Sequence, residues 1–281
     1  REISHKIPSE LMGCKVVQME LDNCQQLTST CKNIETIIHL AAMNAPQCKE
    51  NPNQAFLVNT KGTLNLLKAA SNSGVKDFIY FSTAHIYGSP LQGLINESTI
   101  PNPSHPYSVT HKRAEEHVLE FDSKGLISGI VLRLSNVIGA PLNKKANCWY
   151  LAPNNFCRQA VIERKIKMTG GSKERDFISM TSVGDLIEFI IQNPTSMKNE
   201  KIINIGSRVM SILELSTLIA ERCNILFGYS PKITIDNTDE EKIGSKLQYL
   251  CRIYEKLNIR STRTLTEEID KLLLFCNKEF N

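Results

Sequence analysis

The feature that most constrains the fold of this chain is a regular alternation of apolar runs with helix-periodic runs. The apolar runs do not alternate strictly with polar residues, which is typical of strands buried on both faces of a sheet. Strands are predicted at 14–21, 33–42, 75–82 and 129–139, and helices at 51–74 and from Pro106 toward Phe121. This order predicts an α/β fold with a parallel sheet covered by helices on both faces.

After Pro141 the pattern loosens into short helices separated by brief strands. Helices are predicted at 153–164, 183–192, 211–223 and 264–276, and a strand at 201–206. We therefore expect a Rossmann-like, doubly wound domain at 1–140 and a smaller α/β lobe at 141–281, with some of its segments returning to the sheet. We expect this lobe over the carboxyl ends of the strands, where open α/β sheets bind ligands.

Composition narrows the class of partner. The net charge of +4 over 281 residues is small and evenly scattered, which argues against a nucleic-acid surface and for a small-molecule site. There is no apolar run of about 20 residues for a membrane span, and no signal-peptide pattern. The nine cysteines form no CxxC pair, which predicts free thiols, no metal site and a reducing, cytoplasmic compartment.

The segment 106–116 contains candidate catalytic residues, and its sequence is PYSVTHKRAEE. On a helix, residues four apart lie on the same face, whereas residues five apart do not. His111 therefore shares a face with Tyr107, and Lys112 is expected to point elsewhere. A tyrosine four residues before a lysine is a feature of many oxidoreductases, so His111 stands where the lysine would be.

Together, several segments in this order resemble the extended short-chain dehydrogenase/reductase family, in its NAD-dependent epimerase/dehydratase branch that acts on nucleotide sugars. The resemblance runs from about Val16 to Cys276. Its segments are IIHLAA, NTKGTLNLLKAA, YFSTAHIYG, PYSVTHKRAEE, RLSNVIG, RDFISMTSVGDLI and NIGS. The resemblance implies an enzyme with NAD as cofactor, NADP being the alternative, and a nucleotide sugar as substrate.

The resemblance also implies catalytic roles. Tyr107 would exchange a proton with the substrate hydroxyl, and Thr83 would hydrogen-bond the same oxygen. A free phenol has a pKa of roughly 10, so it needs a nearby cation to act as a base at neutral pH. His111 would be mostly neutral at pH 7, although it could still donate a hydrogen bond to the nicotinamide ribose. The alternative is a histidine on the helix surface without a role.

Other roles follow from the resemblance position by position. The cofactor would be lined by Leu40, Ala41 and Ala42, with Asn59 beneath the tyrosine helix and Glu20 near the adenine. For each of these the alternative is a loop residue that satisfies local backbone groups.

The substrate diphosphate would be held by Asn136, Asn155 and Arg175, since the fixed fork of an arginine matches phosphate oxygens. The alternative for each is again a loop residue that satisfies local backbone groups. His85 stands where the family's dehydratases and decarboxylases generally carry glutamate, so loss of water from a sugar is disfavoured. His85 would be an extra acid or base near the sugar, or simply a packed side chain.

The family's glycine-rich G-x-x-G-x-x-G motif, which receives the cofactor pyrophosphate at a helix N-terminus, does not occur in the sequence. We therefore expect these residues to be part of a longer chain, and we expect them alone to have an unpaired sheet, weak cofactor binding and poor solubility. Arg1 falls about where family members that prefer the phosphorylated cofactor often carry arginine.

The sequence thus predicts an NAD(P)-dependent epimerase, or a related oxidoreductase, for a nucleotide sugar. The alternative is a non-catalytic member of the same fold that binds a nucleotide or a partner protein, which the histidine at 111 and the missing glycines would fit. A homodimer formed through a pair of helices that includes 106–121 is compatible with the sequence.

Overall fold

The computed structural model describes residues 12–197, 199–236, 246–257 and 264–281, so Arg1 lies outside the described residues. The chain forms two compact units. Unit 1 comprises 1–89, 101–133 and 195–202, and unit 2 comprises 90–100, 134–194 and 203–281. Domains at 1–140 and 141–281 remain a proposal.

Unit 1 is built on the neighbouring strands β1, β2 and β4, and β8 begins at the last residue of the unit. β1 and β2 run parallel, with His39 opposite Tyr80. The strands are β1 (Thr36–His39), β2 (Asp77–Thr83), β4 (Ser128–Leu134) and β8 (Ile202–Ile205). The helices are α1 (Cys24–Thr30), α2 (Ala45–Glu50), α3 (Pro52–Ala55), the π-helical η2 (Phe56–Lys61), α4 (Gly62–Asn72), the 3₁₀ turn η3 (Ala84–Tyr87), α5 (Pro106–Ser123) and α8 (Pro194–Met197).

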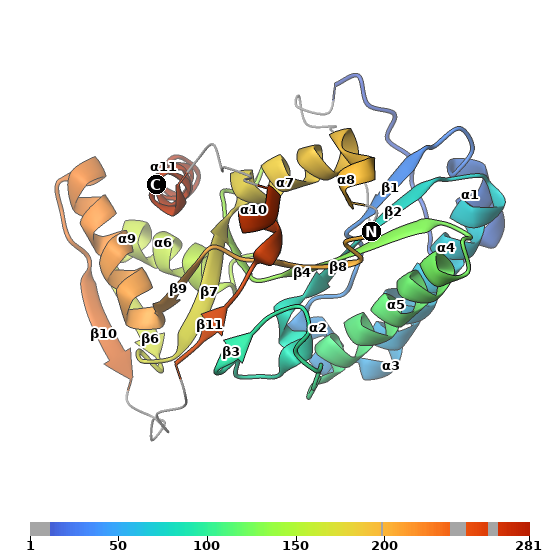
Figure 1. Cartoon of the computed structure of the whole chain (residues 1–281). Coiled ribbons are helices and arrows are strands. Elements are labelled where there is room, and N and C mark those ends of the chain that lie inside the picture. Colours follow the sequence, from blue (N-terminus) through green and yellow to red (C-terminus); the bar gives the residue numbers. More distant parts are fainter. Residues whose placement is uncertain (1–11, 198, 237–245, 258–263) are drawn as a thin grey trace. The chain divides into compact units, whose positions relative to one another are not determined.

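The core of unit 1 forms where α4 and α5 pack together, and α5 also packs on β2 (Figure 1). One buried cluster contains Leu67 and Ala70 of α4, Ala114 and Val118 of α5, and Phe78 of β2. Apolar residues spaced three or four apart give each helix one buried face. This packing fixes the face of α5 that carries Tyr107 and His111.

Unit 2 has its own core, formed by α6, α9 and α11, which pack against one another (Figure 1). Its strands pair as β5-β7-β9, β10-β6 and β11-β3. The strands are β3 (Leu94–Ile95), β5 (Asn136–Ile138), β6 (Lys165–Thr169), β7 (Glu174–Ser179), β9 (Arg208–Ser211), β10 (Lys232–Asp236) and β11 (Gln248–Tyr249). The helices are α6 (Ala152–Ile162), α7 (Met180–Gln192), α9 (Ile212–Phe227), α10 (Arg252–Leu257) and α11 (Leu265–Phe280).

Two strand predictions are wrong. Residues 14–21 form no strand; Val16 and Val17 are exposed, and this segment has no ladder partner among the described residues. The predicted strand 129–139 is two strands, because β4 pairs within the first sheet whereas β5 pairs with β7. The other predicted helices and strands are confirmed within a few residues. Among the described residues no helix is both long and apolar enough to cross a membrane.

Candidate active site

The start of α5 places Tyr107 in the first helical turn. Pro106 suits this turn because its ring fixes φ and its missing N–H is not needed there. His105 is the N-cap: its ring Nδ1 accepts the N–H of Ser108 at 3.3 Å, and the Ser108 hydroxyl oxygen accepts the N–H of His105 at 3.3 Å. The His105 ring also stacks on Tyr107, with centroids 6.2 Å apart. His105 therefore sets both the start of the helix and the position of the tyrosine ring.

His111 is buried, so the alternative of a surface histidine is wrong. Its ring meets the Tyr107 ring edge-on, with centroids 4.5 Å apart, and its Nδ1 lies 2.7 Å from the hydroxyl of Tyr80 on β2. Burial, with a smaller contribution from His39, lowers the pKa of His111 to about 3. The expectation of a neutral imidazole is confirmed, and this imidazole supplies no positive charge at pH 7.

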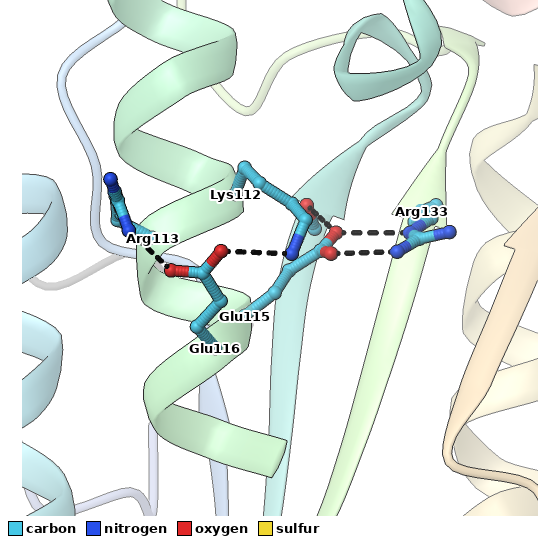
Figure 2. Close-up of polar contacts among 6 residues, drawn as sticks. Lys112, Arg113, Glu115, Glu116 and Arg133 are labelled. Atoms are coloured by element: carbon cyan, nitrogen blue, oxygen red, sulfur yellow. Dashed lines mark hydrogen bonds and ion pairs between the residues drawn. The ribbon is translucent and has the colours of Figure 1, made fainter. Parts of the chain in front are cut away.

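Lys112 points away from this face, as the helical spacing predicts. Its Nζ lies 3.2 Å from Oε1 of Glu116, and Arg113 Nη1 lies 3.0 Å from the other oxygen of the same carboxylate (Figure 2). Lys112 therefore does not take the place of the family lysine.

On the inner side of α5, Glu115 and Arg133 form a buried ion pair that the sequence analysis missed (Figure 2). The Glu115 carboxylate accepts from Arg133 Nε at 3.1 Å, from Arg133 Nη2 at 2.8 Å and from the Ser82 hydroxyl at 2.6 Å. Arg133 Nη1 donates to the Tyr87 hydroxyl at 2.8 Å. An arginine inside the apolar run GIVLRLSN was the available signal, because a buried guanidinium requires a buried acceptor. The network connects α5 and β4 to Ser82, which precedes Thr83, and to Tyr87, which follows it in η3.

Thr83 is buried at the carboxyl end of β2, where it caps the turn η3. Its Oγ1 accepts the backbone N–H of His85 at 3.2 Å, and this contact does not use the hydroxyl proton of Thr83. The half-buried His85 ring meets His105 edge-on, with centroids 5.8 Å apart. The structure therefore brings Thr83, His85, Tyr107 and His111 together in unit 1, on η3, the end of β2 and the helix α5 that packs on both.

Asn59 lies beneath the tyrosine helix, in the π-helical turn η2. Its side-chain oxygen accepts the N–H of Met43 at 2.7 Å, and its amide nitrogen donates to the hydroxyl of Thr110 at 3.1 Å. Irregular helical turns of this kind often mark functional sites. Asn59 joins the loop that follows β1 to α5, which makes it a support for this loop.

The residues predicted to line the cofactor fall on separate segments of the chain. Leu40 and Ala41 are exposed and Ala42 is half-buried, in the loop at the carboxyl end of β1. Glu20 is exposed, and its backbone N–H donates to the side chain of Gln26 at 3.0 Å. Their cofactor contacts remain proposals.

In unit 2, the predicted substrate residues lie on β5, α6 and β7. Asn136 donates to the backbone oxygen of Asp176 at 2.9 Å, and Arg175 is exposed beside it on β7. Asn155 is half-buried in α6. Asp176 accepts the N–H of Ser207 at 3.1 Å, and burial raises its pKa to about 7. The structure therefore brings Asn136 and Arg175 to neighbouring strands.

All nine cysteines are free thiols, as predicted. Five of them, Cys31, Cys48, Cys157, Cys223 and Cys276, are buried, whereas Cys14 and Cys24 are exposed. No cluster that could hold a metal ion occurs within the described parts of the chain.

The buried histidines of unit 1 give a testable pH dependence. Burial lowers the pKa of His39 to about 4 and that of His111 to about 3, below the 6.5 of an unperturbed histidine. Between pH 6.5 and pH 4 the unfolded chain therefore binds protons that the folded chain does not, so stability falls as the pH falls. Each histidine contributes a slope of about 1.4 kcal/mol per pH unit.

Replacing His111 with glutamine is expected to reduce this slope by about 1.4 kcal/mol per pH unit, whatever its effect on absolute stability. Urea denaturation at pH 4.5, 5.5 and 6.5 measures the slope. His117→Gln changes a half-buried histidine on the same helix and serves as the control. An unchanged slope in His111→Gln would contradict a neutral, buried His111.

Residues 2–206 match the NAD dependent epimerase/dehydratase family. The chain belongs to this family. The family match covers the whole cluster around Tyr107, together with Asn136, Asn155 and Arg175. The fold predicted for it, a Rossmann-like α/β arrangement, is the one that structures of the family show.

Two relatives within this family illustrate its range. The chain is 32% identical over 215 residues to the GDP-6-deoxy-D-talose 4-dehydrogenase of Aggregatibacter actinomycetemcomitans, which covers 73% of this chain and 70% of that protein. It is 25% identical over 194 residues to the UDP-glucose 4-epimerase of Rhizobium leguminosarum bv. trifolii, covering 63% of this chain and 59% of that protein. The chain thus spans about three fifths to seven tenths of the length of these two relatives.

Two solved structures share the fold. The UDP-glucuronic acid 4-epimerase from Bacillus cereus in complex with NAD superimposes with a TM-score of 0.79 at 20% identity, covering 94% of this chain and 81% of that one. RMD from Pseudomonas aeruginosa complexed with NADPH gives a TM-score of 0.76 at 21% identity, covering 93% and 88%.

Proposed function

We propose that the chain acts as an NAD(P)-dependent epimerase, or as a related oxidoreductase, on a nucleotide sugar. One observation carries the proposal: Tyr107 stands one helical turn before the buried His111, on a helix that packs on the strand ending at Thr83. Family membership supports it, since the relatives are named as nucleotide-sugar epimerases and dehydrogenases.

Two side chains of unit 1 divide the proton chemistry. Tyr107 removes a proton from the substrate hydroxyl, or returns one to the corresponding ketone. Thr83 donates its hydroxyl proton to the same oxygen and so orients it. A bound nicotinamide would accept the hydride from the adjacent carbon. An epimerase returns this hydride to the other face of the sugar, whereas a reductase releases the cofactor after each turnover.

The structure fits the nicotinamide half of such a cofactor. His111 Nε2 is buried without a hydrogen-bond partner in the described structure. By its place in the motif, His111 would meet the ribose as the family lysine does. Leu40, Ala41 and Ala42 follow β1 at the carboxyl edge of the sheet, where dinucleotides bind in doubly wound folds. Glu20 would lie toward the adenine. The sequence contains no glycine-rich phosphate loop for the pyrophosphate.

Residues of unit 2 would bind the diphosphate of the substrate. Arg175, Asn136 and Asn155 would hold the diphosphate, with Arg175 binding its oxygens through a bidentate fork. His85 would serve near the sugar ring. A homodimer and a cytoplasmic location remain predictions.

A second candidate is a non-catalytic member that binds a nucleotide. The neutral imidazole of His111 favours it, because a neutral group stabilises a phenolate less than an ammonium does. The two candidates differ in turnover: a binding protein retains cofactor affinity but converts no nucleotide sugar.

Calorimetry with NAD and NADP tests the proposal. We expect the chain to bind one of them weakly, because it has no glycine-rich phosphate loop. We expect His111→Lys to bind it about three- to tenfold more tightly, because an ammonium adds a charged donor for the ribose. In alcohol oxidation, the same variant should reach half of its maximal rate at a lower pH, because the ammonium stabilises the phenolate. Absence of binding in both proteins would refute the enzyme proposal.

A further inference from the structure

The contact between Tyr80 and His111 decides which form of the imidazole the site contains. A neutral histidine carries its proton on one ring nitrogen, so it has one donor and one acceptor. Nδ1 of His111 lies 2.7 Å from the Tyr80 hydroxyl, and Nε2 has no hydrogen-bond partner within the described structure. Tyr80 and His111 are both almost fully buried. Bulk water is therefore not a hydrogen-bond partner of this pair, and the position of the proton depends on the partners within the protein.

The number of unsatisfied polar groups decides whether Tyr80 or His111 donates in this hydrogen bond. If Nδ1–H donated to Tyr80, the phenol proton and the Nε2 lone pair would both lack partners in a buried place. If the Tyr80 O–H donates to Nδ1, only the Nε2–H lacks one. Leaving a buried polar group without a partner is unfavourable, so the second arrangement is the more stable. Burial also raises the pKa of Tyr80 well above 10, which keeps its hydroxyl protonated as a donor.

We propose that Tyr80 is a positioning residue that holds His111 in its Nε2–H tautomer and so presents a hydrogen-bond donor to the cofactor ribose. The ribose contact rests on the proposed function. A lysine at this place needs no such help, because each of its three N–H groups is a donor. A histidine offers a donor in this direction in only one of its tautomers. With Tyr80 holding this tautomer, the histidine provides the donor that a lysine would provide alone.

The surroundings keep His111 neutral. It is faced by Tyr107 on its own helix, by Tyr80 on β2 and, beyond Tyr80, by His39 on β1, whose ring centroid lies 5.7 Å from that of Tyr80. The Thr63 hydroxyl donates to the backbone oxygen of Asn59 at 2.6 Å, so it must accept from Nε2–H of His39 at 2.9 Å. His39 therefore donates its Nε2–H to Thr63, and burial, which lowers its pKa to about 4, keeps the ring neutral. The negative charge of Glu115 acts on Tyr80 and further favours the protonated phenol.

The test has two readouts. Nitrogen-15 NMR of the histidine rings in the cofactor-free protein reports which nitrogen carries the proton. Calorimetry with NAD reports the affinity. Both are made for the wild type, Tyr80→Phe, His111→Lys and the double variant. Tyr87→Phe removes another buried hydroxyl of unit 1, one that accepts from Arg133, and serves as the control.

We expect a protonated Nε2 and an unprotonated Nδ1 in the wild type and in Tyr87→Phe, and a mixture of tautomers in Tyr80→Phe. Tyr80→Phe should weaken NAD binding about three- to tenfold. In the His111→Lys background the same change should have little effect, because lysine has no tautomer to fix.

A proton on Nδ1 of His111 in the wild type, or an unchanged tautomer in Tyr80→Phe, would overturn the role of Tyr80. An equal loss of NAD affinity in the histidine and lysine backgrounds would show that Tyr80 acts through packing alone, and would also overturn it. If the wild type binds no NAD, the proposed function and the ribose contact fail together, while the NMR spectra still decide whether Tyr80 fixes the tautomer.

Discussion

Replacing Glu115 with alanine is expected to lower the free energy of unfolding of unit 1 by about 3–5 kcal/mol. The change removes the acceptor of two Arg133 N–H groups and of the Ser82 hydroxyl. Arg133 is then left as a charge without its carboxylate, in a place where 2% of its surface is exposed. Urea denaturation followed by circular dichroism, with hydrogen exchange of the α5 amides, measures the loss.

Glu116→Ala is the matched control, because Glu116 is the next residue on α5 and pairs with Lys112 and Arg113 at the surface (Figure 2). Exposed ion pairs contribute about 0–1 kcal/mol, so this variant should unfold almost as the wild type does. A double change, Glu115→Met with Arg133→Leu, removes both charges and should destabilise less than Glu115→Ala alone. Equal losses in Glu115→Ala and Glu116→Ala would show that the buried pair is not formed.

Replacing Tyr107 with phenylalanine is expected to lower kcat by about 10²- to 10⁴-fold on a nucleotide sugar that the wild type converts. The change removes one oxygen, and with it the group that exchanges a proton with the sugar hydroxyl. The ring remains, so its contacts with His105 and His111 should be kept. Turnover of a panel of UDP- and GDP-hexoses, followed by chromatography, measures the effect.

Stability and cofactor affinity separate the chemical effect of Tyr107→Phe from a structural one. The variant should melt within a few degrees of the wild type and bind NAD with a similar dissociation constant. Full activity in Tyr107→Phe would exclude Tyr107 as the acid or base. Loss of NAD binding together with activity would instead indicate damage to the pocket.

Local spacing was enough to predict the site residues on one helix, and too little to predict their partners. The four-residue interval correctly put His111 beside Tyr107 and turned Lys112 away, because helix geometry fixes neighbours within a turn. Tyr80 is 31 residues from His111 in the sequence, and only the packing of α5 on β2 brings the two together. Such a pairing has no periodic signal.

Strand predictions failed for a related reason. An apolar run such as CKVVQMEL has the composition of a strand, but a strand exists only if another one pairs with it. In the run at 129–139 apolar residues continue on both sides of Ser135, so its composition does not show that one sheet ends and another begins there. Pairing depends on residues far away in the chain, here Ile178 opposite Val137.

Asn59 connects two segments through a single amide group, since Met43 donates to its oxygen and its nitrogen donates to Thr110. Local opening of a protein proceeds in cooperative groups of residues. The loop after β1 and the first turns of α5 should therefore open and close as one such group. A ligand that orders the loop after β1 would then also reduce the motion of Tyr107, without contacting α5.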